Sequence, residues 1–417
     1  MNIIQGGITT PKGFLASAVG CGIKSPENKR LDLALVYSPT PTVSASSFTI
    51  NKVKAAPARL SEERAKTHHF QAILANSGNA NACTGVVGMN DATETSQQIS
   101  DALDIVPERV AICSTGVIGI PLPMGRITPN FSELVNQLAD TPEQGAKVAQ
   151  AIMTSDTQSK EIALNLEIGG QTVTIGGCAK GAGMINPNMA TMLCFITTDA
   201  SISGDALKKA HQMAVDHSFN RITIDGDMST NDSVITLANG VAKNPSIQLD
   251  TPDFQLFAEA LQTVMLELAK MMVRDGERVT KCVKVQVQNA TTESDAKKIA
   301  EAVSNSALVK SSWNGNDPNW GRIIHAVGYS GAELEESKID IYLNQAIACE
   351  KGLQSNTPIE ALQNIVEAKE FTITIDLNLG SKDYWMYSSD LSPEYVDFNR
   401  SEYAYWKQGR LDGTVKG

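Results

Sequence analysis

The chain has 417 residues, of which 42% are hydrophobic and 19% are charged, and its formal net charge is −11. This length favours two or three domains with a large core. The acidic balance disfavours a nucleic-acid partner, and the sequence contains neither a secretory signal nor an apolar run of the ~20 residues that span a membrane.

Short apolar runs alternate with amphipathic stretches along the chain. They predict strands at 31–37, 70–75, 110–114, 192–197, 221–224, 283–287 and 371–377. The segments 161–167 and 172–175, joined by a Gly-Gly turn, predict a tight hairpin.

Three helices are also predicted. Thr141-Pro-Glu-Gln144 is a capping box with proline at the first helical position, and it predicts a helix to about residue 153. Apolar residues from Phe254 to Met272 keep helical spacing, and residues 294–307 form another amphipathic stretch. Because no Gly-x-Gly follows a strand and opens a helix, a dinucleotide fold is disfavoured. The mixed order indicates an α+β layered architecture.

The cysteines and histidines predict no metal site and no disulfide frame. The 7 cysteines are scattered without a Cys-x-x-Cys pair, and the 5 histidines form none of the zinc-binding spacings. This pattern favours free thiols in a reducing cytosol, so we expect a cytoplasmic protein.

The stretch from Lys180 to Asp199 carries the most chemical information. A lysine in a glycine-rich turn is followed by Asn-Pro-Asn, and Ala190-Thr191 then stands before an apolar strand. A cut before Thr191 would free its α-amine, which titrates near pH ~8 and can serve as the base for the threonine hydroxyl. The alternative is that Thr191 is an ordinary β-branched residue at the start of a strand.

Two further segments are dense in small residues, amides and hydroxyls beside a strand end. In Cys113-Ser-Thr-Gly-Val-Ile-Gly119, the Thr115 hydroxyl and the Gly116 N–H could form an oxyanion hole. The asparagine-rich segment Asn76–Gly85 either shapes a site or forms local turns.

Four more segments remain open between binding and structural roles. Residues 153–157 could bind a substrate or satisfy helix-end carbonyls, and residues 225–232 favour a hydrogen-bonded turn over a metal site. In residues 275–281, Glu277 offers a carboxylate for a substrate ammonium and Lys281 is its candidate ion-pair partner. Residues 315–322 are expected to form a rigid structural turn around Pro318.

Taken in order, these segments resemble the glutamate N-acetyltransferase/ornithine acetyltransferase family of arginine biosynthesis. The resemblance runs from about residue 6 to residue 400. Its motifs are Gly6–Phe14, Val53–Pro57, Asn76–Gly85, Ser114–Gly116, Thr154–Thr157, Lys180–Asp199, Ser229–Asp232 and Asp317–Arg322.

The resemblance implies a layered αββα-type sandwich that cleaves itself between Ala190 and Thr191. The α chain would be 1–190 and the β chain 191–417, associated as an α₂β₂ heterotetramer or larger. Thr191 would take the acetyl group from N2-acetylornithine and pass it to glutamate, with Thr115 and Gly116 as the oxyanion hole. Thr154, Lys180, Thr191 and Glu277 would contact the substrate. No cofactor is implied, although acetyl-CoA is left open as a second acetyl donor.

The sequence departs from this family at two places. The family generally has glycine where this chain has Arg278, directly after Glu277. Near the C-terminus Asn399 matches a substrate-binding asparagine, but the segment after it diverges and the family's terminal threonine or serine has no counterpart. These departures keep two rivals open: an acyltransferase or amidohydrolase acting on a different N-acyl amine, and an uncleaved binding protein without activity.

Overall fold

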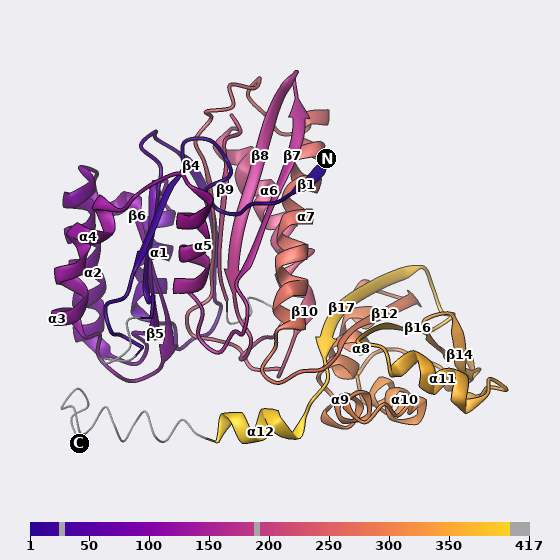
Figure 1. Ribbon diagram of the computed structural model, residues 1–417. Coiled ribbons are helices and arrows are strands. Elements are labelled where there is room, and N and C mark those ends of the chain that lie inside the picture. Colours follow the sequence, from indigo (N-terminus) through magenta and orange to yellow (C-terminus); the bar gives the residue numbers. More distant parts are fainter. Residues whose placement is uncertain (25–29, 187–191, 401–417) are drawn as a thin grey trace.

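The structure, a computed structural model, describes residues 1–24, 30–186 and 192–400. Within these residues the strands form three sheets, two in a larger body and one in a smaller lobe (Figure 1). A search of the described helices finds none that is both long enough and apolar enough to cross a membrane.

The six-stranded sheet of the body contains strands from distant parts of the chain. Its order is β1 (Asn2–Ile4), β7 (Lys160–Ile168), β8 (Gln171–Lys180), β9 (Leu193–Thr198), β11 (Ser233–Ala238) and β4 (Val43–Phe48). The β7–β8 pair is the predicted hairpin, and β9 runs parallel to β11. Every residue of β9 and β11 is buried, as expected for central strands covered on both faces.

The second sheet of the body has four strands. Its order is β2 (Leu15–Val19), β3 (Leu33–Tyr37), β5 (Ala72–Asn79) and β6 (Val110–Val117), with β5 and β6 parallel. Phe14, Ile73 and Val36 on its side share a core with Leu193 and Phe195 of the six-stranded sheet. The two sheets therefore face each other across one apolar layer.

Helices cover the outer faces of both sheets (Figure 1). Helices α6 (Gly204–Asp216) and α7 (Pro252–Arg274) pack on the six-stranded sheet. Val148 of α5 (Pro142–Ala151) and Ile152, which directly follows this helix, pack in the apolar layer between the two sheets. The four-stranded sheet packs against α1 (Ala56–Ala65), α2 (Gly85–Leu103), α3 (Met124–Ile127) and α4 (Phe131–Asn136). Short 3₁₀ turns lie at Pro107–Arg109, Thr128–Asn130, Phe219–Arg221 and Glu336–Lys338.

The smaller lobe has its own core around a seven-stranded sheet. The order is β10 (Ile222–Thr223), β17 (Lys382–Ser389), β12 (Cys282–Ala290), β16 (Glu370–Asp376), β13 (Asp340–Leu343), β14 (Ala346–Glu350) and β15 (Leu353–Gln354). Its helices are α8 (Glu293–Asn305), α9 (Ala307–Asn314), α10 (Trp320–Gly328) and α11 (Ile359–Val366). The last helix, α12 (Pro393–Asn399), leaves this lobe and runs back beneath the body (Figure 1).

The predicted elements are mostly confirmed, with two differences. Thr141 caps α5 by accepting the Gln144 N–H at 3.4 Å, as the capping box predicts. The predicted strand at 221–224 is reduced to the two residues of β10, because the chain before it forms a 3₁₀ turn. The predicted rigid turn at 315–322 is wrong in its second half, where Asn319 caps α10 and Trp320 begins the helix.

One buried histidine predicts how stability changes with pH. His211 on α6 lies between Ser47 on β4 and Thr236 on β11, at 3.0 and 2.9 Å. Burial lowers its pKa from 6.5 to about 3, so the folded protein keeps the ring neutral. Because the unfolded chain binds the proton first, stability is present above about pH 6.5 and is lost as pH falls towards 3.

We therefore expect the free energy of unfolding to fall by about 2 kcal/mol between pH 6.5 and 5 on account of His211. The His211→Gln variant should lose this part of the slope in urea titrations at several pH values. His217, an exposed residue directly after the same helix, is the control, and the His217→Gln variant should keep the wild-type slope. An unchanged slope in His211→Gln would contradict the assignment.

Candidate active site

Thr115 and Gly116 lie near the end of β6, where this strand pairs with β5. Gly116 has φ +136°, and a Cβ on it would overlap the backbone of Gly78 on the neighbouring strand. Only glycine fits this close approach of two backbones. Thr115 is buried and Gly116 is half-buried, so the predicted oxyanion pair, here called the Thr115–Gly116 segment, lies where β6 comes closest to β5.

Buried asparagines form hydrogen bonds around the Thr115–Gly116 segment. The Asn76 amide donates to the Asn79 carbonyl at 2.9 Å and its oxygen accepts from the Ser114 hydroxyl at 2.6 Å. Asn231, before β11, donates to the carbonyls of Ala80 and Ser114 at 2.6 and 2.8 Å. The asparagine-rich segment therefore shapes the site through hydrogen bonds within the protein.

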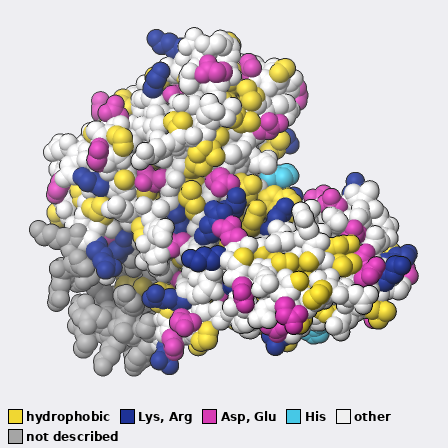
Figure 2. Space-filling view, turned by 45° about the vertical axis from the view of Figure 1, so that its right-hand side comes forward, with side chains coloured by type: hydrophobic (Ala, Val, Ile, Leu, Met, Phe, Trp, Pro, Cys, Tyr) yellow, Lys and Arg dark blue, Asp and Glu magenta, His cyan; other side chains and the backbone are white. Residues whose placement is uncertain are grey.

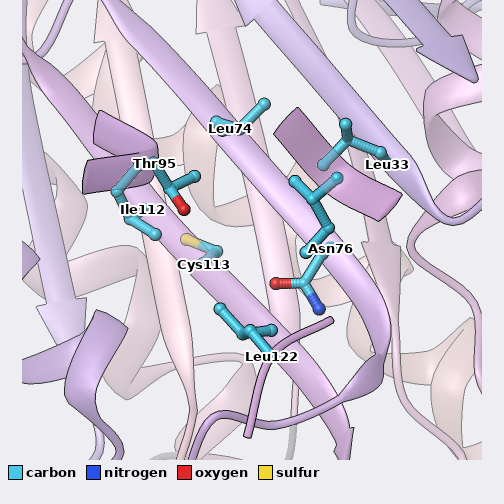
Figure 3. Close-up of a pocket in the computed structure, with 8 residues that line it drawn as sticks. Leu33, Leu74, Asn76, Thr95, Ile112, Cys113 and Leu122 are labelled. Atoms are coloured by element: carbon cyan, nitrogen blue, oxygen red, sulfur yellow. The ribbon is translucent and has the colours of Figure 1, made fainter. Parts of the chain in front are cut away.

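A small cavity lies between the four-stranded sheet and helices α2 and α3, next to Asn76 (Figure 3). Apart from the Asn76 amide and the Thr95 hydroxyl, the side chains around it are apolar, and the lining consists of Leu33, Leu74, Asn76, Thr95, Ile112, Cys113, Leu122 and Ile127. Because both polar ends of Asn76 are already bonded, we assign this cavity to packing between the sheet and its helices and not to substrate binding.

Lys180 ends β8 and is buried against the Thr115–Gly116 segment. Its Nζ donates to the Thr115 hydroxyl oxygen at 3.4 Å and lies 4.0 Å from Asp156 Oδ2. Burial lowers the pKa of Lys180, and the charge of Asp156 opposes this effect. Since Thr115 accepts from Lys180, its own hydroxyl proton remains free to donate to a bound oxygen.

Asp156 connects Lys180 to a second buried cation. Its Oδ1 accepts from Lys160 Nζ at 2.8 Å and from the Gly181 N–H at 2.7 Å, and Lys160 also reaches Asp275 at 2.6 Å. Burial alone raises the pKa of Asp156, but the Lys180 and Lys160 ammonium groups overcome it and lower this pKa to about 2. The carboxylate is therefore ionised at neutral pH, and it fixes the turn in which Lys180 stands.

Thr154 lies on the rim of this cluster. Its backbone N–H donates to Asp156 Oδ2 at 3.0 Å, and its side chain is exposed. Asp275, which ends α7, accepts from the Thr157 and Gln158 backbone N–H groups at 3.0 and 3.2 Å. The turn after α5 is thus tied to the end of α7.

Glu277 follows this helix end and faces the loop after Lys180. Its N–H donates to the Ala182 carbonyl at 2.8 Å, and a Cβ on Gly183 would lie 2.6 Å from Glu277 Oε1. Asn399, at the end of α12, donates to Glu277 Oε2 at 2.9 Å. The predicted ion pair with Lys281 is wrong, because Lys281 Nζ instead donates to Asn316 Oδ1 and to three carbonyls at the end of α11.

Ala190 and Thr191 lie outside the described residues, but the next residue is placed. The Met192 N–H donates to Asp232 Oδ1 at 3.0 Å, and Asp232 is fully buried. Burial raises the pKa of Asp232 well above its ordinary value. Its second oxygen has no hydrogen-bond partner among the described residues.

The described site residues form one connected set drawn from distant parts of the chain. Contacts run from Thr115 to Lys180, from Lys180 to Asp156 and Thr154, and through the following loop to Glu277 and Asn399. Sequence reasoning missed Asp156, Lys160 and Asp232, because single acidic and basic residues carry no spacing signal. In the part of the chain that is described, no cluster of histidine, cysteine and acidic side chains could hold a metal ion.

On the face drawn in Figure 2, basic and acidic side chains are mixed where the body meets the smaller lobe. No continuous basic patch covers the described part of this face. This distribution accords with the acidic net charge of −11.

Substitution of Gly116 tests the importance of the Thr115–Gly116 segment. The Gly116→Ala variant should lose about 10²–10³-fold in turnover, because its Cβ would displace the strand that carries the predicted oxyanion donors. Gly328→Ala is the matched control, since Gly328 lies in a helix with open space around it and should leave turnover unchanged. Steady-state kinetics and melting curves of both variants measure this, and full turnover in Gly116→Ala would contradict it.

The buried Lys180 ammonium, the buried Thr115 hydroxyl and the close backbone approach at Gly116 lie together, and this combination suits acyl transfer. The chain matches the ArgJ family over residues 15–404, and it belongs to this family. This membership confirms the resemblance noted in the sequence and the prediction of an acetyltransferase of arginine biosynthesis.

Individual relatives agree with this family. The chain is 46% identical over 401 residues to the arginine biosynthesis bifunctional protein ArgJ of Symbiobacterium thermophilum, covering 96% of this chain and 99% of the relative. It is 47% identical over 389 residues to the protein of the same name from Geobacter sulfurreducens, covering 93% and 98%. A solved structure of ornithine acetyltransferase from Mycobacterium tuberculosis, complexed with ornithine, is 36% identical, with a TM-score of 0.42, and covers 46% of this chain and 99% of that one.

Proposed function

We propose that this chain is an N-terminal-nucleophile acetyltransferase that moves the acetyl group of N2-acetylornithine to glutamate. The precursor cuts itself between Ala190 and Thr191, giving an α chain of residues 1–190 and a β chain of residues 191–417. The observation that carries the proposal is the contact between Lys180 and Thr115, at 3.4 Å, beside the close backbone approach at Gly116.

The chemistry requires two acyl transfers through one threonine. The Thr191 hydroxyl attacks the acetyl carbonyl while its α-amine takes the hydroxyl proton. The Thr115 hydroxyl and the Gly116 N–H stabilise the negative oxygen of the tetrahedral intermediate. The C–N bond then breaks, the ornithine amine leaves with the proton, and Thr191 carries the acetyl group as an ester. The glutamate amine attacks this ester, which gives N-acetylglutamate and restores the hydroxyl.

The charged residues of the site suit an amino-acid substrate. Lys180 and Thr154 would bind the α-carboxylate, since a buried ammonium and a hydroxyl both donate to it. Glu277 would bind the side-chain ammonium of ornithine, with Asn399 beside it. The hydrogen bond from Asn399 to Glu277 supports this placement, because it brings the two predicted residues together.

Several finer features belong to the same proposal. The two facing sheets of the body, with helices outside them, support the layered αββα-type sandwich. An α₂β₂ assembly or larger, a cytosolic location and the absence of any cofactor also follow the family resemblance. Acetyl-CoA as a second acetyl donor to glutamate is left to experiment.

The test combines intact-mass analysis with an isotope assay. The purified wild type should give two masses that sum to the 44.6 kDa chain plus one water. With N2-[¹³C]acetylornithine and glutamate, the label should appear in N-acetylglutamate. Free labelled acetate without transfer would instead support an amidohydrolase, and transfer only from another N-acyl amine would support a related acyltransferase. A folded, uncut chain would overturn the nucleophile proposal and support the binding-protein alternative.

A further inference from the structure

Arg278 occupies a backbone position that favours glycine. Its φ is +59°, in the left-handed region that arginine rarely adopts. This chain therefore holds a large cationic side chain where the backbone conformation favours glycine. Such a conformation is retained when surrounding contacts fix it.

Both ends of helix α12 contact this one residue. At its start, the hydroxyl of the capping residue Ser392 donates to the Arg278 carbonyl at 2.7 Å. Near its end, the Arg278 guanidinium lies over the Phe398 ring, 5.0 Å from the ring centre. The next residue, Asn399, is the one that donates to Glu277.

Helix α12 depends on such contacts because it has little core of its own. None of its residues is buried, and Val396 is 61% exposed. A further contact is made by Tyr395, whose hydroxyl donates to Asp225 at 3.3 Å. Asp225 in turn accepts the Met184 and Ile185 N–H groups of the loop after Lys180. The position of the helix is therefore coupled to both sides of the candidate site.

We propose that Arg278 is a positioning residue that fixes α12, and with it Asn399, against the carboxylate that binds the substrate's side-chain ammonium. The proposal rests on the role given above to Glu277. The guanidinium of Arg278 contacts the Phe398 ring, and no ion pair joins Arg278 to Glu277 among the described residues. Arg278 therefore does not occupy the Glu277 carboxylate in place of the substrate.

The test is Arg278→Gly, which removes the side chain and suits the backbone. KM for N2-acetylornithine should rise about tenfold while kcat stays within about twofold, because ammonium binding weakens and the acetyl-transfer groups do not move. Hydrogen exchange of the amides in 393–399 should become about tenfold faster. The melting temperature should hold or rise, since the strain is relieved.

Two further variants separate positioning from a general structural effect. Phe398→Leu should give the same rise in KM, and the double variant with Arg278→Gly should show no additional rise. Lys351→Gly is the matched control, because Lys351 is also an exposed cation with positive φ, at +50°, in the turn before β15. It should leave KM and exchange at 393–399 unchanged.

An unchanged KM and unchanged exchange in Arg278→Gly would overturn the proposal, as would a fall in kcat at constant KM. Absence of acetyl transfer by the wild type would instead refute the proposed function. In that case exchange at 393–399 still decides whether Arg278 holds α12, so the two failures are distinguishable.

Discussion

Replacing Thr191 by alanine should leave one uncut chain of 44.6 kDa that transfers no acetyl group. In the proposed mechanism, this variant lacks the hydroxyl that would attack the Ala190 carbonyl during cleavage and the acetyl carbonyl during turnover. We expect turnover to fall by about 10⁴-fold or more, as for loss of a covalent nucleophile. Intact-mass analysis and the labelled-acetyl assay measure the two effects on the same preparation.

Thr191→Ser is the control for this variant, because it keeps a hydroxyl at the same position. It should cleave and retain part of the activity, whereas the alanine variant should do neither. Cleavage of Thr191→Ala between residues 190 and 191 would show that another group performs the cut. Acetyl transfer by Thr191→Ala at the wild-type rate would rule out the acetyl-threonine intermediate.

Replacing Asp156 by asparagine should have the largest effect on stability among the described site residues. Asp156 lies between the buried ammonium groups of Lys160 and Lys180, at 2.8 and 4.0 Å. Removing its charge leaves Lys180 without its nearest anion, and breaking a buried pair typically costs about 3–5 kcal/mol. Thermal and denaturant unfolding should show this loss, and turnover should fall because the Lys180 turn is no longer fixed.

The Asp156→Asn variant also has an expected pH signature. The charge of Asp156 opposes the burial that lowers the pKa of Lys180, so its removal should lower that pKa further. The alkaline limb of kcat/KM should consequently move to lower pH. Glu63→Gln is the control, since Glu63 and Lys66 form an exposed, solvent-screened pair that contributes little to stability. Equal stability losses in both variants would contradict the argument.

The sequence predicted the central elements of the fold because their patterns are locally strong. The apolar spacing of Phe254–Met272 and the capping box at Thr141 each identify a helix without tertiary information. Helix α2 was missed because it begins at a glycine with positive φ and buries small or hydroxyl residues such as Ala92 and Ser96. Strand β5 continues through Asn76-Ser-Gly-Asn79 because β6 pairs with it, although those residues are poor strand formers.

The candidate site was predictable only where a motif carried it. Thr115, Gly116 and Lys180 stand in dense, recognisable segments, and the structure brings them together. Asp156 and Asp232 gain their significance from burial beside Lys180 and Met192, and burial is a property of the folded chain. The positive φ of Arg278 likewise belongs to the turn between α7 and β12, and no residue pattern in the sequence predicts that conformation.

The strand order of the six-stranded sheet determines whether the two products of the proposed cleavage could fold separately. Strands β9 and β11 belong to the second product, yet they lie between β8 and β4 of the first. Neither fragment can complete this sheet alone, and separating them would break both flanking ladders. The uncut precursor must therefore assemble the sheet before the bond is broken, and the fragments expressed apart should each be insoluble. The proposed cleavage would thus be a chemical maturation step that leaves the six-stranded sheet intact.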